Sequence, residues 1–172
     1  MSFYYPYRFV QNFEGKSGHL LSKRLYSFKS TKSNFTYWVW VELYDYNVYA
    51  IKFHLKNHRH SERKYNILSS TFEPRRIIHT CINIMLDIYH QDDHASFGFI
   101  GSNLDEEGID NTKRFRFYSK IMATNFSDKY FLHTELKDKS AYLMVNKIEL
   151  ENNPNLINDI QDAFTEQYEY FD

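Results

Sequence analysis

The chain has 172 residues, a formal net charge of −1 and 19% aromatic residues. This length fits one domain around one core, and the near-neutral charge excludes a strong overall field toward nucleic acid or anionic membranes. Only 5 glycines and 3 prolines are present, which excludes a linker-rich or disordered protein, and the single cysteine, Cys81, excludes an internal disulfide.

No targeting or membrane segment is visible in the chain. The start, Met1–Val10, has no basic region followed by a long apolar stretch. The longest hydrophobic run, around Tyr37–Val41, is too short to cross a bilayer. We therefore expect a cytoplasmic protein without a membrane partner.

The first half of the chain predicts strands. Residues 1–35 supply N-terminal strands, with Tyr5–Phe13 rich in aromatic residues and His19–Phe28 either a second strand or an irregular segment. Tyr37–Leu43 and Val48–Leu55 are dense in β-forming residues, and the polar residues 45–47 between them favour a turn. These two runs predict an antiparallel hairpin. A further strand is expected over residues 64–69.

A helical period begins at Pro74. Ser70 and Glu73 have the spacing of a capping box, and proline is tolerated in a first helical turn. Apolar side chains then recur every three or four residues, at Ile77, Ile78, Cys81, Ile82, Met85, Leu86 and Tyr89. Because Cys81 lies on this apolar stripe, we expect an inert core thiol rather than a nucleophile.

Residues 95–101 are almost entirely apolar, which is typical of a strand buried on both faces and predicts a central position in the sheet. A polar, acidic loop follows, and Asp110 or Asn111 can cap a second helix. Its expected inward residues are Phe115, Tyr118, Ile121 and Met122, with Lys113, Arg116 and Lys120 outward.

The last elements are a strand pair and a helix. Tyr130–Leu136 and Ala141–Asn146 predict a hairpin, and Pro154–Tyr168 predicts an amphipathic helix within the acidic segment 148–172. Together with residues 36–147 these elements predict a single α+β domain over residues 1–172. Its sheet should be mixed but largely antiparallel, with about six or seven strands, two main helices and a C-terminal helix.

One short motif follows the buried strand: Asn111-Thr112-Lys113-Arg114-Phe115-Arg116-Phe117-Tyr118. Together with the element order over Tyr37–Asn146, it resembles the acyl-CoA N-acyltransferase superfamily, in which an Asn precedes a helix and a Tyr follows two turns along. The resemblance implies an acyltransferase-like topology and acyl-CoA as cofactor. It also implies Tyr118 as the general acid for the departing thiolate, and Asn111 as a cofactor contact.

The chain departs from this superfamily at the pyrophosphate loop. The corresponding residues 69–76 contain no glycine, carry Glu73, and include Pro74, which has no N–H to donate to a phosphate. Arg75 and Arg76 remain as candidate phosphate ligands. The segment Ser96–Tyr118 also resembles an uncharacterised group of short bacterial proteins, a resemblance that implies no chemistry.

The sequence contains two other patterns of interest, one related to metal sites and one to nucleic-acid binding. His54, His58 and His60 lie close together in the sequence, but no carboxylate or thiolate at fixed spacing completes a metal site, so a hydrated basic loop is the favoured interpretation. Residues 52–65 and 113–120 interleave cations with aromatic rings, as surfaces for single-stranded nucleic acid do. The acidic residues 105–110 beside the second stretch argue against nucleic acid.

The favoured hypothesis is a non-catalytic bacterial ligand-sensing or protein-interaction domain, whose partner is another protein or a second copy of the chain. The aromatic excess and the altered pyrophosphate loop favour it. The expected ligand site lies at the carboxyl end of the buried strand, with Gly101, Ser102, Asn103 and Asn111. This hypothesis needs no cofactor. The alternatives are an acyl-CoA-dependent N-acyltransferase and a nucleic-acid-binding module.

Overall fold

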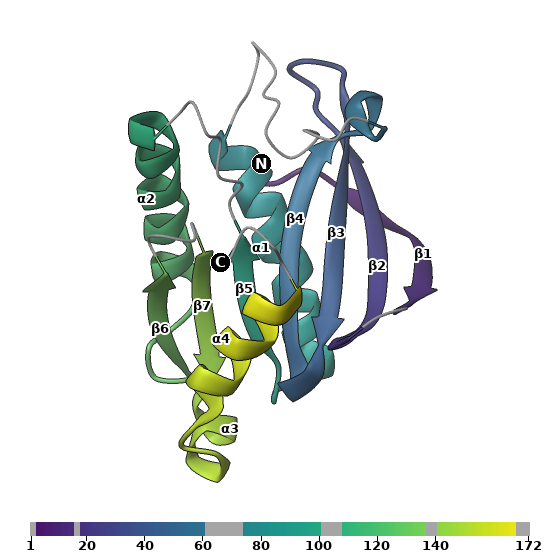
Figure 1. Cartoon of the computed structure of the whole chain (residues 1–172). Helices are drawn as coiled ribbons and strands as arrows, with labels where there is room; N and C mark the ends of the chain where they lie inside the picture. Colours follow the sequence, from purple (N-terminus) through teal and green to yellow (C-terminus); the bar gives the residue numbers. More distant parts are fainter. Residues whose placement is uncertain (1–2, 16–17, 61–73, 101–107, 137–140, 168–172) are drawn as a thin grey trace.

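The computed structural model describes residues 3–15, 18–60, 74–100, 108–136 and 141–167 (Figure 1). The strands are β1 (Tyr7–Glu14), β2 (Leu20–Lys29), β3 (Thr36–Tyr44), β4 (Val48–Leu55), β5 (Ser96–Ile100), β6 (Phe131–Leu136) and β7 (Ala141–Asn146). The helices are α1 (Pro74–Gln91), α2 (Gly108–Asn125), α3 (Lys147–Asn152) and α4 (Leu156–Gln167), with the short 3-10 turns η1 (Asp45–Asn47) and η2 (Lys56–His58).

All the strands belong to one 7-stranded sheet in the order β1-β2-β3-β4-β5-β7-β6. Neighbouring strands are antiparallel except β4 and β5, which are parallel and are connected through α1. Strand β5 therefore lies inside the sheet, between β4 and β7, as its apolar sequence predicts. The protein is an α+β domain with a mixed, mostly antiparallel sheet, which confirms the expected fold class.

The two faces of the sheet are covered differently. Helices α1 and α2 lie against one face and α4 lies on the other (Figure 1). The larger core, on the α1 and α2 side, includes many rings, among them Tyr5, Phe28, Tyr37, Phe97, Phe99, Phe126 and Phe131. The smaller core, under α4, is built around Tyr44, Leu143 and Phe164. Large rings thus fill much of the interior, in keeping with the composition.

The apolar stripe of α1 faces the larger core. Ile77, Ile78, Cys81, Ile82 and Met85 are all buried there, whereas Leu86 and Tyr89 are partly buried, so the predicted face is confirmed. The buried face is wider than the sequence suggested, because Thr80, Ile84 and Ile88 are also buried. The Oγ1 atom of Thr80 accepts a hydrogen bond from the backbone N–H of Tyr5 over 2.9 Å, which ties the N-terminal segment to the helix.

Three predicted details need correction. Helix α2 begins at Gly108, so Asp110 and Asn111 lie inside the helix rather than capping it. Polar and acidic residues are stable in a first helical turn as well as at a cap, so the sequence did not distinguish the two positions. Helix α3 was missed because its sequence is short and polar; the side chain of Asn146 caps it by accepting from the N–H of Ile148 over 3.0 Å. The C-terminal helix begins at Leu156 rather than Pro154.

Several other predictions are confirmed, and two concern residues that the structure does not describe. The hairpins β3–β4 and β6–β7 are confirmed, and so are the outward positions of Arg116 and Lys120. The strand expected over residues 64–69 and the capping box at Ser70 and Glu73 lie outside the described residues. Within the described part of the chain, no helix is long and apolar enough to span a membrane.

Candidate functional site

The sheet face that carries α4 is only partly covered by described helices. Helix α4 packs against the part of this face where β3 ends and β4 begins, around Tyr44 and Val48. Further along, Trp38, Trp40 and Glu42 of β3 lie beside Lys52 and His54 of β4, because the register pairs Trp38 with His54 and Trp40 with Lys52. We call this part of the sheet, defined by these five residues, the open face.

The two tryptophans of the chain both lie on the open face, and each is half-buried. Their rings meet edge to face at 6.2 Å, and the ring of Trp38 also lies 6.0 Å from that of His54. The indole Nε1 of Trp40 donates to Nε2 of His54 over 3.1 Å, so that nitrogen carries no proton. Nδ1 of His54 therefore donates to the carbonyl oxygen of Leu55, 2.8 Å away. His54 is buried and serves to fix the two indoles.

A buried carboxylate compensates the nearby cations. Glu42 is 7% exposed and forms an ion pair with Lys52, with 3.0 Å between Oε1 and Nζ. Its other oxygen lies 4.0 Å from Nζ of Lys23, whose ammonium also lies 4.9 Å from the centre of the Trp40 ring. Lys52, the first cation of the basic stretch 52–65, is thus paired within the protein.

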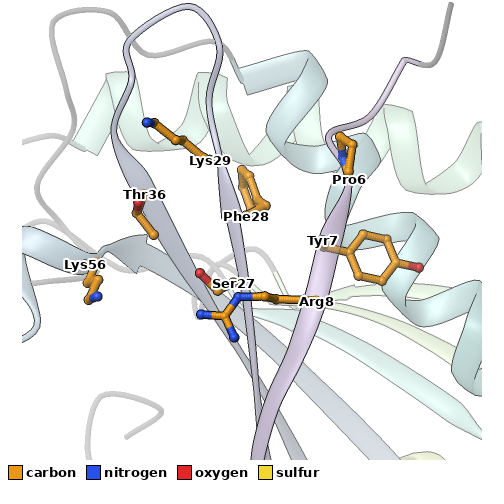
Figure 2. Close-up of a pocket in the computed structure, with 8 residues that line it drawn as sticks. All are labelled: Pro6, Tyr7, Arg8, Ser27, Phe28, Lys29, Thr36 and Lys56. Carbon is orange, nitrogen blue, oxygen red and sulfur yellow. The ribbon is translucent and has the colours of Figure 1, made fainter.

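A hollow of about 430 Å³ lies where β1 begins and β2 ends, and Figure 2 shows its lining. Three cations line it, from β1, the end of β2 and the residue after β4: Arg8, Lys29 and Lys56. The hydroxyl-bearing residues Ser27 and Thr36 lie among them. We call this site the basic hollow.

The charge of the basic hollow is one-sided. The described residues of its lining include no Asp, Glu, His or Cys. Among the described residues, Arg8, Lys29 and Lys56 form no ion pair, in contrast to Lys52 and Lys23. Three cations from separate segments around one hollow attract an anion, since no carboxylate of the described residues compensates their charge there.

The basic hollow adjoins the open face. Ser27 pairs with Trp38 across β2 and β3, and Arg8 pairs with Ser27 across β1 and β2, so the three side chains project from the same face of the sheet. The Nζ atom of Lys56 lies 5.8 Å from the centre of the Trp38 ring. In Figure 2 the ring of Tyr7 points away from the Arg8 side chain, and its hydroxyl donates to the carbonyl of Asn83 in α1.

A second hollow, of about 520 Å³, lies beside β1 and α1. It mixes charges, because both Arg24 and Asp87 line it. The hydroxyl of Tyr7 bonds to the carboxylate of Asp87, and burial together with this hydrogen bond raises the pKa of Tyr7. The carboxylate of Asp87 already accepts a hydrogen bond from Tyr7, and its charge offsets that of Arg24. This hollow is therefore a weaker candidate for a ligand site than the basic hollow.

The structure places the residues of the predicted acyl-CoA site in different surroundings. Tyr118 is buried in the larger core, with its ring edge-on to Phe99 at 5.4 Å. Arg76 stacks over the ring of Tyr5 at 3.9 Å, and Arg75 lies 6.0 Å from the ring of Phe117. Asn111 lies in the first turns of α2. Tyr118, Arg75 and Arg76 are not among the described residues that line either hollow.

Three further predicted ligand residues, Gly101, Ser102 and Asn103, lie outside the described residues. The residues of the basic hollow were missed by the sequence analysis, because Arg8, Lys29 and Lys56 are far apart in the chain. The signal in the sequence was weak: Lys29 and Lys56 directly follow predicted strands, Arg8 lies inside another, and only the sheet order brings the three together.

Two histidines, His19 and His94, bond to carboxylates of the protein. His94 bonds through Nδ1 to Oε1 of Glu149 in α3 over 2.6 Å, and this hydrogen bond raises its pKa. His19 bridges Asp45 and Glu166 at 2.9 and 2.5 Å, and its pKa is raised by its hydrogen bonds, first that to Glu166. In the part of the chain that the structure describes, no three His, Cys, Asp or Glu residues converge as metal ligands.

Compared with protein-family models, with curated proteins and with solved structures, the chain gives no match. The function of the protein is therefore inferred from the chemistry of its site.

Proposed function

We propose that this protein is a non-catalytic ligand-sensing domain that binds a small anion in the basic hollow. The observation that carries the proposal is the grouping of Arg8, Lys29 and Lys56 around one hollow, without a described carboxylate to pair with any of them. Charge-assisted hydrogen bonds from Arg and Lys are the usual means of binding phosphate or carboxylate groups.

The lining favours binding over catalysis. Ser27 and Thr36 supply hydroxyls that can donate to an anion, but no described His or carboxylate lies in the lining to activate either as a nucleophile. Arg8 and Lys29 lie on paired strands and Lys56 directly follows β4, so the sheet holds the three backbone positions near one another before the ligand arrives.

The test is calorimetric titration of the full chain with inorganic pyrophosphate at low ionic strength. We expect binding that weakens as salt is added, and a loss of at least about tenfold in affinity in the double variant R8Q/K56Q, because two charged contacts are removed. The matched control is K120Q, which removes an exposed cation of α2 away from the hollow. Absence of binding, or equal binding by R8Q/K56Q, would contradict the proposal.

One observation favours the alternative, an acyl-CoA-dependent N-acyltransferase. The order of strand, helix, buried strand, helix and strand pair that underlies the resemblance is present, and the parallel register of β4 with β5 runs only from Val48 and Ser96 to Ile51 and Phe99. Strand β4 continues to Leu55 in its pairing with β3, beyond its last described pair with β5.

Coenzyme A distinguishes the two functions. A ligand that binds only the native state raises the melting temperature, so an acyltransferase should be stabilised by millimolar coenzyme A. On this alternative R8Q/K56Q should keep the stabilisation, because the resemblance places coenzyme A beside β5 and α2 rather than in the basic hollow. A stabilisation that R8Q/K56Q abolishes would come from the phosphates of coenzyme A in the basic hollow and would count against the alternative, as would a flat response.

A further inference from the structure

We infer that the ligand of the basic hollow is an aromatic anion, such as a nucleoside monophosphate, whose ring stacks on Trp38. This inference rests on the proposed function, because it assumes that the anion binds at Arg8 and Lys56. It adds the chemical class of the remainder of the ligand.

The first step is the position of Trp38. It neighbours Ser27, which lines the hollow, and its ring lies below Nζ of Lys56, which also lines the hollow. An anion between Arg8 and Lys56 would therefore have an indole beside it on the same face of the sheet. Trp38 is only half-buried, so part of the ring is available for contact.

The second step is the rigidity of the aromatic surface. Trp38 packs edge-on against Trp40, and both are supported by His54, which is hydrogen-bonded on each ring nitrogen. A ring held in this way loses little side-chain entropy when a planar ligand stacks on it, and a stacked base commonly strengthens binding substantially.

The third step is the choice of chemistry. The cations next to Trp38 disfavour a cationic aromatic ligand, and the indoles disfavour a purely inorganic anion as the best ligand. In a ligand with a planar ring joined to a phosphate, the phosphate can bind the cations of the basic hollow while the ring stacks on Trp38. Two other cations lie near the rings. Lys52 is paired with Glu42, and Lys23 lies over Trp40 within 4.0 Å of the same carboxylate, so neither competes for the anion.

Adenosine monophosphate and ribose 5-phosphate provide the test, since they share the phosphate and the sugar and differ in the ring. We expect adenosine monophosphate to bind at least about tenfold more tightly to the full chain, an advantage that W38L should abolish and W38F should largely retain. Ribose 5-phosphate should bind wild type and W38L equally, which also shows that the variant is folded. With excitation at 295 nm, adenosine monophosphate should quench the indole fluorescence of the wild type more than that of W38F, in which only Trp40 remains.

The outcomes separate the two proposals. Equal binding of both phosphates, lost in R8Q/K56Q, would overturn the aromatic inference and leave the anion site standing. Binding of neither phosphate would overturn both. Tight binding of adenosine monophosphate that W38L leaves unchanged would overturn the inference, because the ring would then stack elsewhere.

Discussion

The indole of Trp40 and the imidazole of His54 form a hydrogen bond of 3.1 Å across β3 and β4. It fixes the tautomer of a buried histidine and joins the two strands through their side chains as well as through their backbones. The same bond holds the aromatic surface next to the basic hollow, so it links the stability of the sheet to the proposed site.

Replacing Trp40 with Phe should therefore destabilise the fold. The change removes the donor to a buried ring nitrogen, which costs about 1–3 kcal/mol in addition to lost packing. The matched control is W38F, which loses a similar ring area but not this hydrogen bond. Urea unfolding followed by circular dichroism measures both, and equal losses of unfolding free energy would show that the hydrogen bond contributes nothing.

The contacts of His19 predict a dependence of stability on pH. Its pKa is raised in the folded state by hydrogen bonds to Glu166 of α4 and Asp45 of η1. The protonated form is thus favoured by folding, so its contribution is fully present below about pH 6.5 and is lost as the pH rises through the raised value. We expect the melting temperature to fall as the pH rises from the unfolded pKa of histidine into the alkaline range.

The variant H19Q should flatten that fall, and H19Q/H94Q should flatten it further, because the pKa of His94 is raised by Glu149 in the same direction. The control is H90Q, at an exposed position of α1. A pH profile of H19Q that superimposes on that of the wild type would show that the bridge to α4 does not couple to folding.

Gly98 of β5 should not tolerate alanine. A Cβ atom there would lie 3.1 Å from Cδ2 of Leu143 and 3.3 Å from Cε2 of Phe164, so the added methyl group presses on the packing of α4. We expect G98A to lower the unfolding free energy by about 1–3 kcal/mol. The loss should be smaller when G98A is made in a F164A background, and a double-mutant cycle without coupling would contradict this explanation.

The thiol of Cys81 should be unreactive in the native protein. It is fully buried in the larger core, and burial raises its pKa far above the usual range, so little thiolate forms. Ellman's reagent at pH 8 should label the cysteine only after urea is added. Rapid labelling in the absence of urea would contradict the assignment of Cys81 to packing.

Elements with a clear hydrophobic pattern can be predicted from the amino-acid sequence alone, because the pattern reflects which side chains are buried. The stripe from Ile77 to Met85 in α1, the β-forming runs on either side of the turn at Asp45–Asn47, and the apolar residues of β5 all have a period or density that reflects local burial. Elements without such a pattern, such as the polar helix α3 and the start of α2 at Gly108, were missed or misplaced.

The position of the basic hollow, in contrast, depends on the tertiary structure. Arg8, Lys29 and Lys56 come from three segments, and each taken alone has the pattern of a solvated cation at a strand end. Their proximity depends on the order of β1 to β4, and their lack of carboxylate partners among the described residues contrasts with the pairing of Lys52 by Glu42. Pairing between distant strands is a non-local property, because it depends on registers that no single stretch of residues encodes.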